Sequence, residues 1–338
     1  RIKMTIQERK VDLRVSIVPC VWGEKICMRL LDQGNLKVNL QDLGFEPHVL
    51  ENFMEGVKKP NGIVLVTGPT GSGKTTTLYS CLNLLNNPGC NIMTAEDPVE
   101  YNLMGINQVQ CYPDIGLDFA AALRSFLRQD PNVIMIGEIR DLESASIAIK
   151  AAMTGHLVIS TLHTNDAPST VARLLNMGIE PFMVTTSIRV VEAQRLVRKI
   201  CKSCYTEFKP PPDLVESLGV NAKVMDRLRL KDFDLGNLVF AKGAGCEECD
   251  QGGYKGRQGI YEVLTMTEGL RTMIEGKGTP EDLRRQALAD GMLSLRESAL
   301  FKLLNKRTTA DEVFRVTLEG GGGDEKDDKK GQVKQVSA

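Results

Sequence analysis

The chain has 338 residues, a formal net charge of −1, and contents of charged and hydrophobic residues of 25% and 42%. This length suggests about two domains with at least one sizeable core, and the near-neutral charge argues against a dedicated nucleic-acid binder. The sequence shows no apolar run long enough to suggest a transmembrane span and no pattern of a secretory signal. Because the chain begins at Arg1 inside a strand-like stretch, we expect it to be a fragment of a longer protein.

Two stretches near the start, residues 11–18 and 25–31, alternate apolar and polar side chains around a turn at residues 22–24. A period of two is typical of half-buried strands, so we predict an antiparallel pair. We interpret residues 1–36 as the end of a small α+β domain and residues 37–44 as a polar linker.

Short apolar runs then alternate with helical patterns over residues 45–200, which we interpret as one domain. The predicted elements are the strands 63–67, 91–95, 133–136 and 157–161 and the helices 118–128 and 142–153. Alternating β and α elements predict a parallel sheet covered by helices. Since ligands of such sheets gather at the C-terminal ends of the strands, the polar residues just past each strand are candidate site residues.

A glycine-rich segment follows the strand at 63–67 and reads Gly68-Pro69-Thr70-Gly71-Ser72-Gly73-Lys74-Thr75, with Thr76 next. A strand, a glycine-rich turn and a helix form the context of a phosphate-binding P-loop. The backbone amides would form an anion nest, Lys74 would reach the β- and γ-phosphates, and the Thr75 hydroxyl would bind Mg²⁺. We predict a nucleotide triphosphatase, with a chance match of a glycine-rich turn as the alternative.

Three carboxylates, Glu96, Asp97 and Glu100, come directly after the strand at 91–95. At a strand end beside a P-loop, such groups are suited to hold Mg²⁺ through water and to orient the attacking water. The alternative is an acidic, solvated turn that starts at Pro98.

The acid expected after the strand at 133–136, in the Walker B position, is Glu138. Its longer side chain favours contact with a Mg²⁺-bound water over contact with the metal itself. Asp141 is better explained as the N-cap of the helix at 142–153.

Two of the three histidines, His156 and His163, lie on either side of the strand at 157–161. His163 occupies the place of a γ-phosphate sensor. For His156, at the opposite end of the strand, a structural role is at least as well supported.

Four of the nine cysteines form two pairs, Cys201-x-x-Cys204 and Cys246-x-x-Cys249, which predict a structural zinc site with no open ligand position. A redox pair and an iron–sulfur cluster are the alternatives. We assign residues 201–262 to a zinc-binding subdomain. Unpaired thiols beside a P-loop suggest a reducing cytoplasm.

Short helices are predicted in the C-terminal region, residues 263–318. Thr279 followed by proline begins one helix, Gly291 ends it, and the spacing from Thr309 to Glu312 is that of a capping box. The glycine-rich, charged tail at 319–338 is predicted to be disordered.

Together these motifs resemble the type II/type IV secretion ATPase superfamily, most of all the type IV pilus assembly (extension) ATPases. The resemblance runs from about Val11 to Thr317 and includes, besides the P-loop, an aspartate box at 96–100, an atypical Walker B motif at 137–141 and a histidine box at 155–166. The tetracysteine module is similar to that of assembly and secretion ATPases, and pilus retraction ATPases lack it. The resemblance implies an α/β fold with a RecA-like P-loop core and, at residues 1–36, part of a PAS-like domain.

The resemblance also implies roles for single residues of the P-loop and the aspartate box. Lys74 and Thr75 would bind phosphate and Mg²⁺. Glu100 would polarise the attacking water, with Glu96 and Asp97 as supporting, magnesium-associated acids.

Further roles implied by the resemblance lie in three other segments. Glu138 would be the Walker B acid, also associated with Mg²⁺, and His163 would contact the γ-phosphate. Arg14 and Arg29 would close onto the triphosphate as arginine fingers. Exposed arginines on the polar face of a strand are the alternative.

Members of this family form hexameric rings that act on an inner-membrane platform protein from the cytoplasmic face of the membrane. The resemblance thus implies a motor for pilin polymerisation that uses ATP, Mg²⁺ and Zn²⁺. The alternatives are a type II secretion ATPase, a nucleic-acid translocase built on the same core, and a scaffold that binds ATP without hydrolysing it.

Overall fold

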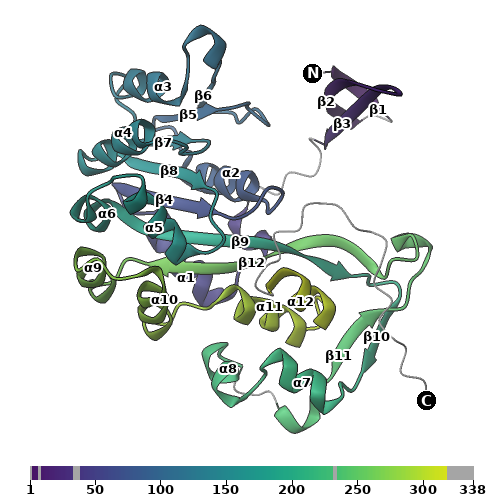
Figure 1. Cartoon of the computed structure of the whole chain (residues 1–338). Coiled ribbons are helices and arrows are strands. Elements are labelled where there is room, and N and C mark those ends of the chain that lie inside the picture. The colour runs from purple at the N-terminus through teal and green to yellow at the C-terminus, as the bar shows by residue number, and fades with distance from the viewer. Residues whose placement is uncertain (1, 7–8, 33–38, 231–233, 318–338) are drawn as a thin grey trace.

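A seven-stranded sheet forms the centre of the molecule (Figure 1). The computed structural model describes residues 2–6, 9–32, 39–230 and 234–317. The strand order is β12-β9-β4-β8-β7-β5-β6, in which only β12 runs antiparallel to its neighbour. The strands are β4 (Gly62–Thr67), β5 (Ile92–Glu96), β6 (Asn107–Gln110), β7 (Val133–Ile136), β8 (Leu157–Leu162), β9 (Ile188–Ile200) and β12 (Tyr254–Thr265). The four predicted strands correspond to β4, β5, β7 and β8 and are confirmed.

Helices cover both faces of this sheet, so each central strand is buried on both sides. In β4, Val64 and Val66 pack into one core cluster, and Ile63 and Leu65 pack into the other. The first cluster contains α1 (Pro47–Val57), α2 (Lys74–Leu85), α11 (Leu295–Leu304) and α12 (Ala310–Thr317). The second contains α3 (Phe119–Phe126), α4 (Leu142–Met153), α5 (Ala167–Asn176), α6 (Pro181–Ser187), α9 (Glu268–Glu275) and α10 (Pro280–Ala289). Two-sided burial explains why these strands appear in the sequence as continuous apolar runs.

Several helix ends follow the predicted capping chemistry. Asp141 caps α4 by accepting a hydrogen bond from the Ser144 amide, and Thr279 forms a capping box with Asp282 at the start of α10. Gly291, at φ +99°, lies just past the end of α10. Among the described helices, we find none with both the length and the apolar character needed to span a bilayer.

The capping box predicted at Thr309 forms only in part. Thr309 Oγ1 accepts from the Glu312 amide at 3.4 Å, as a cap does. The buried Glu312 carboxylate, however, accepts hydrogen bonds from Arg198 of β9 and from Arg315. A buried carboxylate is stabilised more by two guanidinium groups than by one backbone amide, and the interaction fixes α12 on the sheet.

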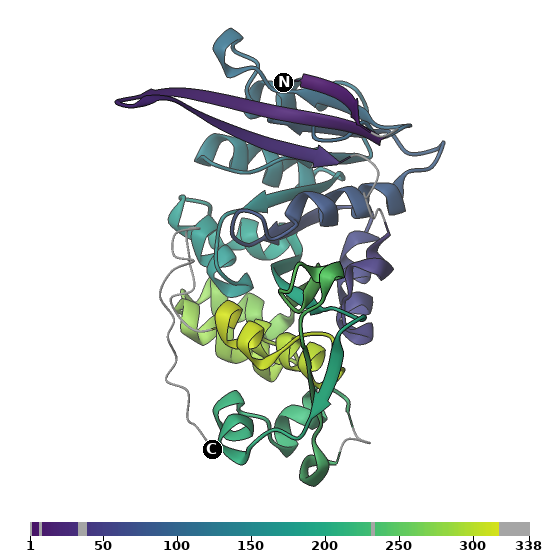
Figure 2. The same ribbon diagram turned by 90° about the vertical axis from the view of Figure 1, so that its right-hand side faces the viewer.

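A separate three-stranded antiparallel sheet precedes the large one and consists of β1 (Ile2–Ile6), β2 (Arg9–Cys20) and β3 (Gly23–Asp32). The predicted pairing of β2 with β3 is confirmed, although Gly23 already pairs with Cys20, so the turn lies one residue earlier than expected. Figures 1 and 2 show this sheet beside the edge where the parallel strands of the large sheet end. Of the predicted linker, residues 39–44 are described, and the predicted tail at 319–338 lies outside the described residues.

The end of this linker is fixed on the C-terminal region. Phe45 stacks on Tyr261 of β12 with ring centroids 3.5 Å apart. Glu46 is fully buried, and its carboxylate accepts from Lys302 of α11 at 2.7 Å. A buried ion pair of this kind specifies one arrangement, because removal of either partner leaves an uncompensated charge.

A long antiparallel pair of strands, β9 and β12, is the main element that the sequence analysis missed. The two strands flank a cysteine-containing segment with β10 (Tyr205–Phe208), β11 (Phe240–Gly243), α7 (Pro212–Leu218) and α8 (Ala222–Arg227). Residues 201–262, predicted as a zinc subdomain, therefore include much of a strand of the large sheet. This segment lies at one end of the pair, and the P-loop contacts the middle of β9.

Candidate active site and metal centre

The glycine-rich loop connects the end of β4 to the start of α2. Gly68, Gly71 and Gly73 adopt φ values of +143°, +79° and +94°, a region that favours glycine. A Cβ on Gly68 would lie 2.4 Å from the carbonyl oxygen of Gln194, so the close approach of β9 also requires glycine there. The loop conformation thus depends on its glycines, as expected for a P-loop.

Lys74, the first residue of α2, lies across this loop. Its Nζ donates to the carbonyl oxygens of Gly68 at 2.7 Å and Pro69 at 3.1 Å. Burial lowers the pKa of Lys74, and the nearby charges of Glu138 and Glu192 act in the opposite direction. The Oγ of Ser72 is buried and has no hydrogen-bond partner among the described residues. A phosphate would give this hydroxyl a partner and would attract the ammonium group.

Gln194 of β9, which the sequence analysis did not identify, holds the loop from the side. Its Nε2 donates to the Ser72 carbonyl at 2.6 Å, and its Oε1 accepts from Thr77 Oγ1 of α2 at 2.6 Å. The sequence gives little signal for it, because the strand Ile188–Ile200 also carries other polar residues such as Glu192 and Arg195. Both the oxygen and the nitrogen of the Gln194 side-chain amide are hydrogen-bonded, so Gln194 fixes the loop relative to the helix that follows.

The three acids at the end of β5 and just after it lie in different environments. Glu96 is buried, and its carboxylate accepts from Tyr79 Oη at 2.5 Å, Thr94 Oγ1 at 2.6 Å and Gln108 Nε2 at 3.1 Å. Asp97 is exposed. Glu96 is therefore committed to hydrogen bonds within the protein, while Asp97 stays accessible to solvent.

Glu100 forms an ion pair with Arg14 of the N-terminal sheet. Arg14 Nη2 lies 2.6 Å from Glu100 Oε2, and each side chain is 23% exposed. The structure thus brings together two predicted site residues that are far apart in the sequence. Arg29 is the strand partner of Arg14, but its side chain lies outside what the structure describes.

Glu138 and His163 meet at the neighbouring strand ends. Glu138 follows β7, and its Oε2 lies 2.8 Å from His163 Nε2, while its other oxygen accepts from Arg140. Burial would raise the pKa of Glu138, but the hydrogen bonds from Arg140 and His163 outweigh it, and the pKa lies below its usual value. Glu138 is thus stabilised as an ionised carboxylate, and its charge acts on the P-loop lysine.

His156 lies at the opposite end of β8 from His163. Its Nδ1 is 3.0 Å from the carbonyl oxygen of Ala151 near the end of α4. This contact agrees with the structural role considered for it from the sequence.

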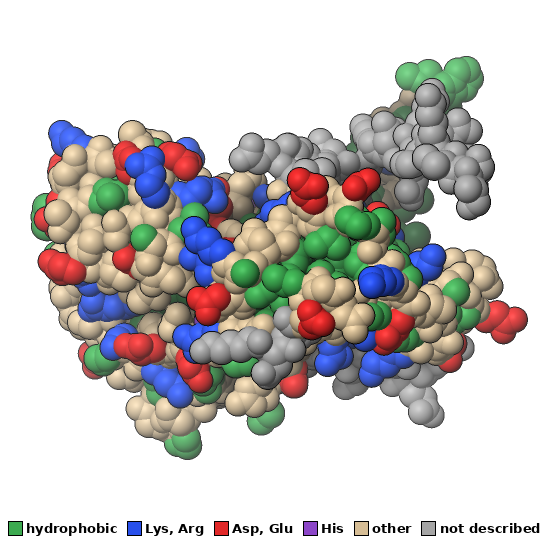
Figure 3. Space-filling model, turned by 90° about the horizontal axis from the view of Figure 1, so that it is seen from below, with side chains coloured by type: hydrophobic (Ala, Val, Ile, Leu, Met, Phe, Trp, Pro, Cys, Tyr) green, Lys and Arg blue, Asp and Glu red, His purple; other side chains and the backbone are tan. Residues whose placement is uncertain are grey.

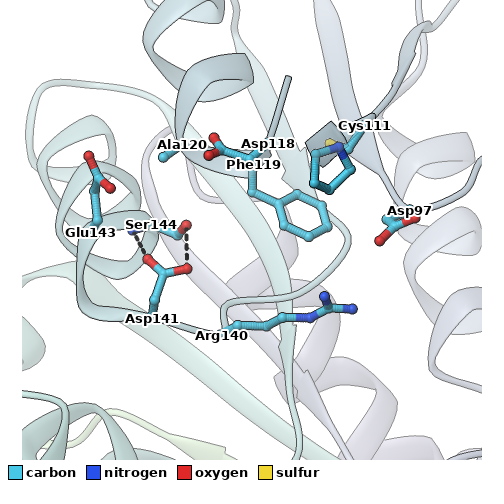
Figure 4. Close-up of a pocket in the computed structure, with 10 residues that line it drawn as sticks. Asp97, Cys111, Asp118, Phe119, Ala120, Arg140, Asp141, Glu143 and Ser144 are labelled. Carbon is cyan, nitrogen blue, oxygen red and sulfur yellow. Dashed lines mark hydrogen bonds between the residues drawn. The ribbon is translucent and has the colours of Figure 1, made fainter. Parts of the chain in front are cut away.

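A pocket of about 160 Å³ adjoins the acids, between the ends of β5 and β7 and the starts of α3 and α4 (Figure 4). Arg140 extends along it towards Asp97. The pKa of Arg140 is raised above its usual value, mainly by the hydrogen bond to Glu138 and to a smaller extent by the charge of Asp97. The Arg140 guanidinium lies 6.0 Å from the centre of the Phe119 ring. Arg140 therefore links the aspartate box to the Walker B segment.

The histidine box also contacts the P-loop directly. Thr67, which precedes Gly68, shares hydrogen bonds with Thr164: the two hydroxyl oxygens are 2.8 Å apart, and the Thr164 amide donates to Thr67 Oγ1 at 3.0 Å. Asp166 caps α5 and pairs with Arg284 of α10 at 2.6 Å. The residues after β8 are thus fixed on both sides.

The four paired cysteines form one cluster, with all four Sγ atoms within 4.8 Å of one another. The Sγ distances are 3.8 Å for Cys201–Cys246, 3.8 Å for Cys204–Cys249 and 3.6 Å for Cys246–Cys249. Four thiolates at Zn–S bonds of about 2.3 Å in a tetrahedron lie ~3.8 Å apart, so the cluster fits zinc. These distances are too long for disulfides.

Backbone amides support this cluster. The amides of Cys246 and Gly253 each donate to Cys249 Sγ at 3.2 Å, and the amide of Gly245 donates to Cys204 Sγ at 3.3 Å. Donors of this kind stabilise thiolate charge, which is the form that binds metal. The chemistry of the donor set therefore agrees with the spacing predicted from the sequence.

A P-loop and acidic strand ends on a parallel sheet define an α/β fold of the kind that binds nucleotides, and this chain adds a tetracysteine cluster to it. The chain belongs to the family described as type II/IV secretion system protein, whose model matches residues 1–315. It is 52% identical over 309 residues to the type IV pilus assembly ATPase PilB of Myxococcus xanthus, covering 91% of this chain and 53% of that protein. It is 44% identical over 319 residues to type II secretion system protein E of Pseudomonas aeruginosa, covering 94% of this chain and 61% of that protein. The chain spans little more than half the length of the curated relatives it matches.

Solved structures show the same fold. The pilus retraction motor PilT with bound ADP matches with a TM-score of 0.64 and 24% identity, over 94% of this chain and 77% of that one. The ATPase DotB of Legionella pneumophila matches with a TM-score of 0.61 and 21% identity, over 90% and 71% of the two chains. At these sequence identities the comparisons show a shared fold alone.

The cysteine cluster predicts one zinc ion per chain. Cys246→Ser should reduce the zinc content measured by atomic emission to well below one equivalent and lower the melting temperature, because structural zinc contributes on the order of 10 kcal/mol. Cys20→Ser, at an exposed cysteine outside the cluster, is the matched control and should leave both unchanged. Full zinc content in the Cys246 variant, or iron in place of zinc, would contradict the assignment.

Proposed function

We propose that this chain is the motor part of a type IV pilus assembly ATPase, which hydrolyses ATP to drive pilin subunits into a growing fibre. The observation that carries the proposal is the ion pair between Glu100, which follows β5, and Arg14 of the separate N-terminal sheet. On the same large sheet, Lys74 lies across the loop after β4, and the charge of Glu138 acts on its pKa. The identity of 52% with a pilus assembly ATPase supports the particular motor chosen.

The P-loop binds the triphosphate in this proposal. Backbone amides of the loop at 68–75, other than that of Pro69, and the Ser72 hydroxyl surround the phosphates, and Lys74 leaves its two carbonyl partners for the β- and γ-phosphate oxygens. Exchange of neutral carbonyls for phosphate oxygens is favourable for an ammonium group. The loop is thus preorganised for its ligand by Gln194 and by its glycines.

Glu100 serves as the base for the attacking water. The water oxygen forms a bond to the γ-phosphorus as the bond between that phosphorus and the ADP oxygen breaks, and the Glu100 carboxylate accepts the water proton. Since Glu96 is buried and already accepts three hydrogen bonds, its geometry favours a positioning role over the water-mediated magnesium association expected from the sequence.

The residues suited to hold Mg²⁺ are Thr75, through its hydroxyl, and the accessible Asp97, with Glu138 acting through a bound water. Both oxygens of Glu138 already have partners, in agreement with an indirect contact. Bound Mg²⁺ supplies positive charge that offsets the charge on the phosphates. His163, the partner of Glu138 Oε2, contacts the γ-phosphate.

Arg14 links the chemistry to movement. In the structure its guanidinium neutralises Glu100, which keeps the base occupied. Transfer of Arg14, together with Arg29, to the γ-phosphate frees Glu100 and draws the N-terminal sheet onto the nucleotide. Loss of phosphate after hydrolysis reverses the transfer, so each turnover moves one sheet relative to the other.

A hexameric ring of such chains transmits this motion to an inner-membrane platform protein from the cytoplasmic face. This arrangement is proposed from the family and from the position of the N-terminal sheet. The second candidate is a type II secretion ATPase, since relatives of that class are 44% identical.

A nucleic-acid translocase is less well supported. Seen from below, lysine and arginine side chains are interspersed with aspartate and glutamate (Figure 3). Binding to a phosphate backbone favours a concentrated positive surface. Stimulation of ATP turnover by DNA or RNA would favour this alternative.

Replacement of Lys74 by alanine tests ATP hydrolysis. Steady-state turnover should fall by at least ~10²–10³-fold, because one preorganised cation at the transferred phosphate is lost. The melting temperature should stay close to that of the unmodified protein. Lys59→Ala is the control, since Lys59 forms an exposed ion pair with Glu55 and lies outside the site. Turnover that survives in the Lys74 variant would remove the loop from the mechanism, and an unmodified chain without turnover would favour the non-hydrolysing scaffold.

A chimera tests the kind of motor. Residues 11–317 would replace the matching part of PilB in a Myxococcus xanthus strain that lacks its own PilB. Surface pili counted by electron microscopy should return, and the same chimera with Lys74→Ala should produce none. A stable chimera with measurable ATP turnover but without pili would argue for the type II secretion motor.

A further inference from the structure

We propose that Tyr79 is a positioning residue for ATP hydrolysis, because its phenol joins the P-loop helix to the segment that carries Glu100. The proposal rests on the function proposed above and adds a residue that none of the motifs contains. Tyr79 is on α2, five residues after Lys74, and its side chain is fully buried. Its position relative to the phosphate loop is therefore set by a continuous helix.

All the hydrogen-bonding capacity of the Tyr79 hydroxyl is used. It donates to Glu96 Oε2 at 2.5 Å and lies within reach of two backbone amides, those of Glu100 at 3.3 Å and Tyr101 at 3.5 Å. A phenol has one donor and two acceptor sites, and this arrangement satisfies them together. The donor is stable, since burial and the charge of Glu96 raise the pKa of Tyr79 far above working pH.

The segment that these hydrogen bonds hold is a loop. Residues 97–101 form neither helix nor strand. Gln108 also stabilises the segment: its Nε2 donates to Glu96 Oε1 at 3.1 Å and to the Tyr101 carbonyl oxygen at 3.0 Å. Hydrogen bonds from side chains thus stabilise this segment in place of the backbone hydrogen bonds of a helix or strand.

Glu100 is consequently held at two points. Tyr79 contacts its backbone amide, and Arg14 contacts its carboxylate. When Arg14 moves to the nucleotide, the contacts around the Tyr79 hydroxyl keep Glu100 in place. A general base displaced by about 1 Å loses on the order of 10²-fold in rate, so the geometry of this contact matters to turnover.

A purely structural role for Tyr79 is the competing explanation, because its ring packs against Tyr101 with centroids 6.1 Å apart. Tyr79→Phe keeps the ring and removes only the hydroxyl. Thr94→Val is the matched control: it removes a hydrogen bond of similar length, 2.6 Å, to the same Glu96 carboxylate and leaves the Tyr79 hydroxyl in place. The two variants thus share the loss of a buried hydrogen bond to Glu96 and differ in the link to Glu100.

We expect Tyr79→Phe to lower kcat for ATP by about 10–100-fold while KM stays within about twofold. Thr94→Val should keep kcat within about twofold at a comparable loss of melting temperature. In a Glu100→Gln background, Tyr79→Phe should cause no further decrease, since a residue that acts through Glu100 has nothing left to position.

Equal losses of kcat in Tyr79→Phe and Thr94→Val, or additive losses with Glu100→Gln, would overturn the proposal. If the Tyr79 variant does not fold, hydrogen exchange of the unmodified protein decides: the Glu100 and Tyr101 amides should be protected, and rapid exchange there contradicts the proposal. An unmodified chain without ATP turnover would instead refute the proposed function, so the two failures are distinguishable.

Discussion

A loop of backbone amides closed by one ammonium group is the feature on which the site depends. Its conformation requires φ values that favour glycine at Gly68, Gly71 and Gly73 and the close approach of β9. Around it, the parallel strands place their carboxyl ends along one edge, which brings acids from separate segments together. The arrangement is stable because the strands are buried on both faces, so the sheet cannot shift without exposing its core.

Fixed contacts and exchangeable contacts lie side by side in this site. Glu96, Tyr79 and Gln194 are buried, and their hydrogen bonds join parts of one rigid core. Arg14 and Glu100 are partly exposed, and Arg14 lies on the N-terminal sheet whereas Glu100 lies in the loop after β5. An ion pair of that kind exchanges partners readily when a phosphate with higher charge arrives, whereas the buried groups stay in place. This difference separates the residues that hold the site in place from those that change partners during turnover.

The sequence predicted those strands and helix ends that depend on residues close together in the chain. The four central strands appeared as short β-branched runs, and Asp141 and Thr279 marked helix starts through their own backbone contacts. The pairing of β9 with β12 was missed because its hydrogen bonds join strands separated by a long insertion, and no local signal records such pairing. The capping box at Thr309 was only partly right, since the Glu312 carboxylate accepts hydrogen bonds from Arg198, which is distant in the sequence.

The same limit applies to the site. Motif residues such as Lys74 and Glu138 were found because their place after a strand predicts their neighbours. Tyr79 and Gln194 were not, because a tyrosine in an apolar helix and a glutamine in a strand acquire their roles only through packing.

The most direct test of the account is a structure of the protein with Mg²⁺ and a non-hydrolysable ATP analogue. We expect the triphosphate within the loop at residues 68–75, with Lys74 Nζ moved from the carbonyls of Gly68 and Pro69 to phosphate oxygens. An analogue bound elsewhere, with those two carbonyl contacts unchanged, would contradict the account.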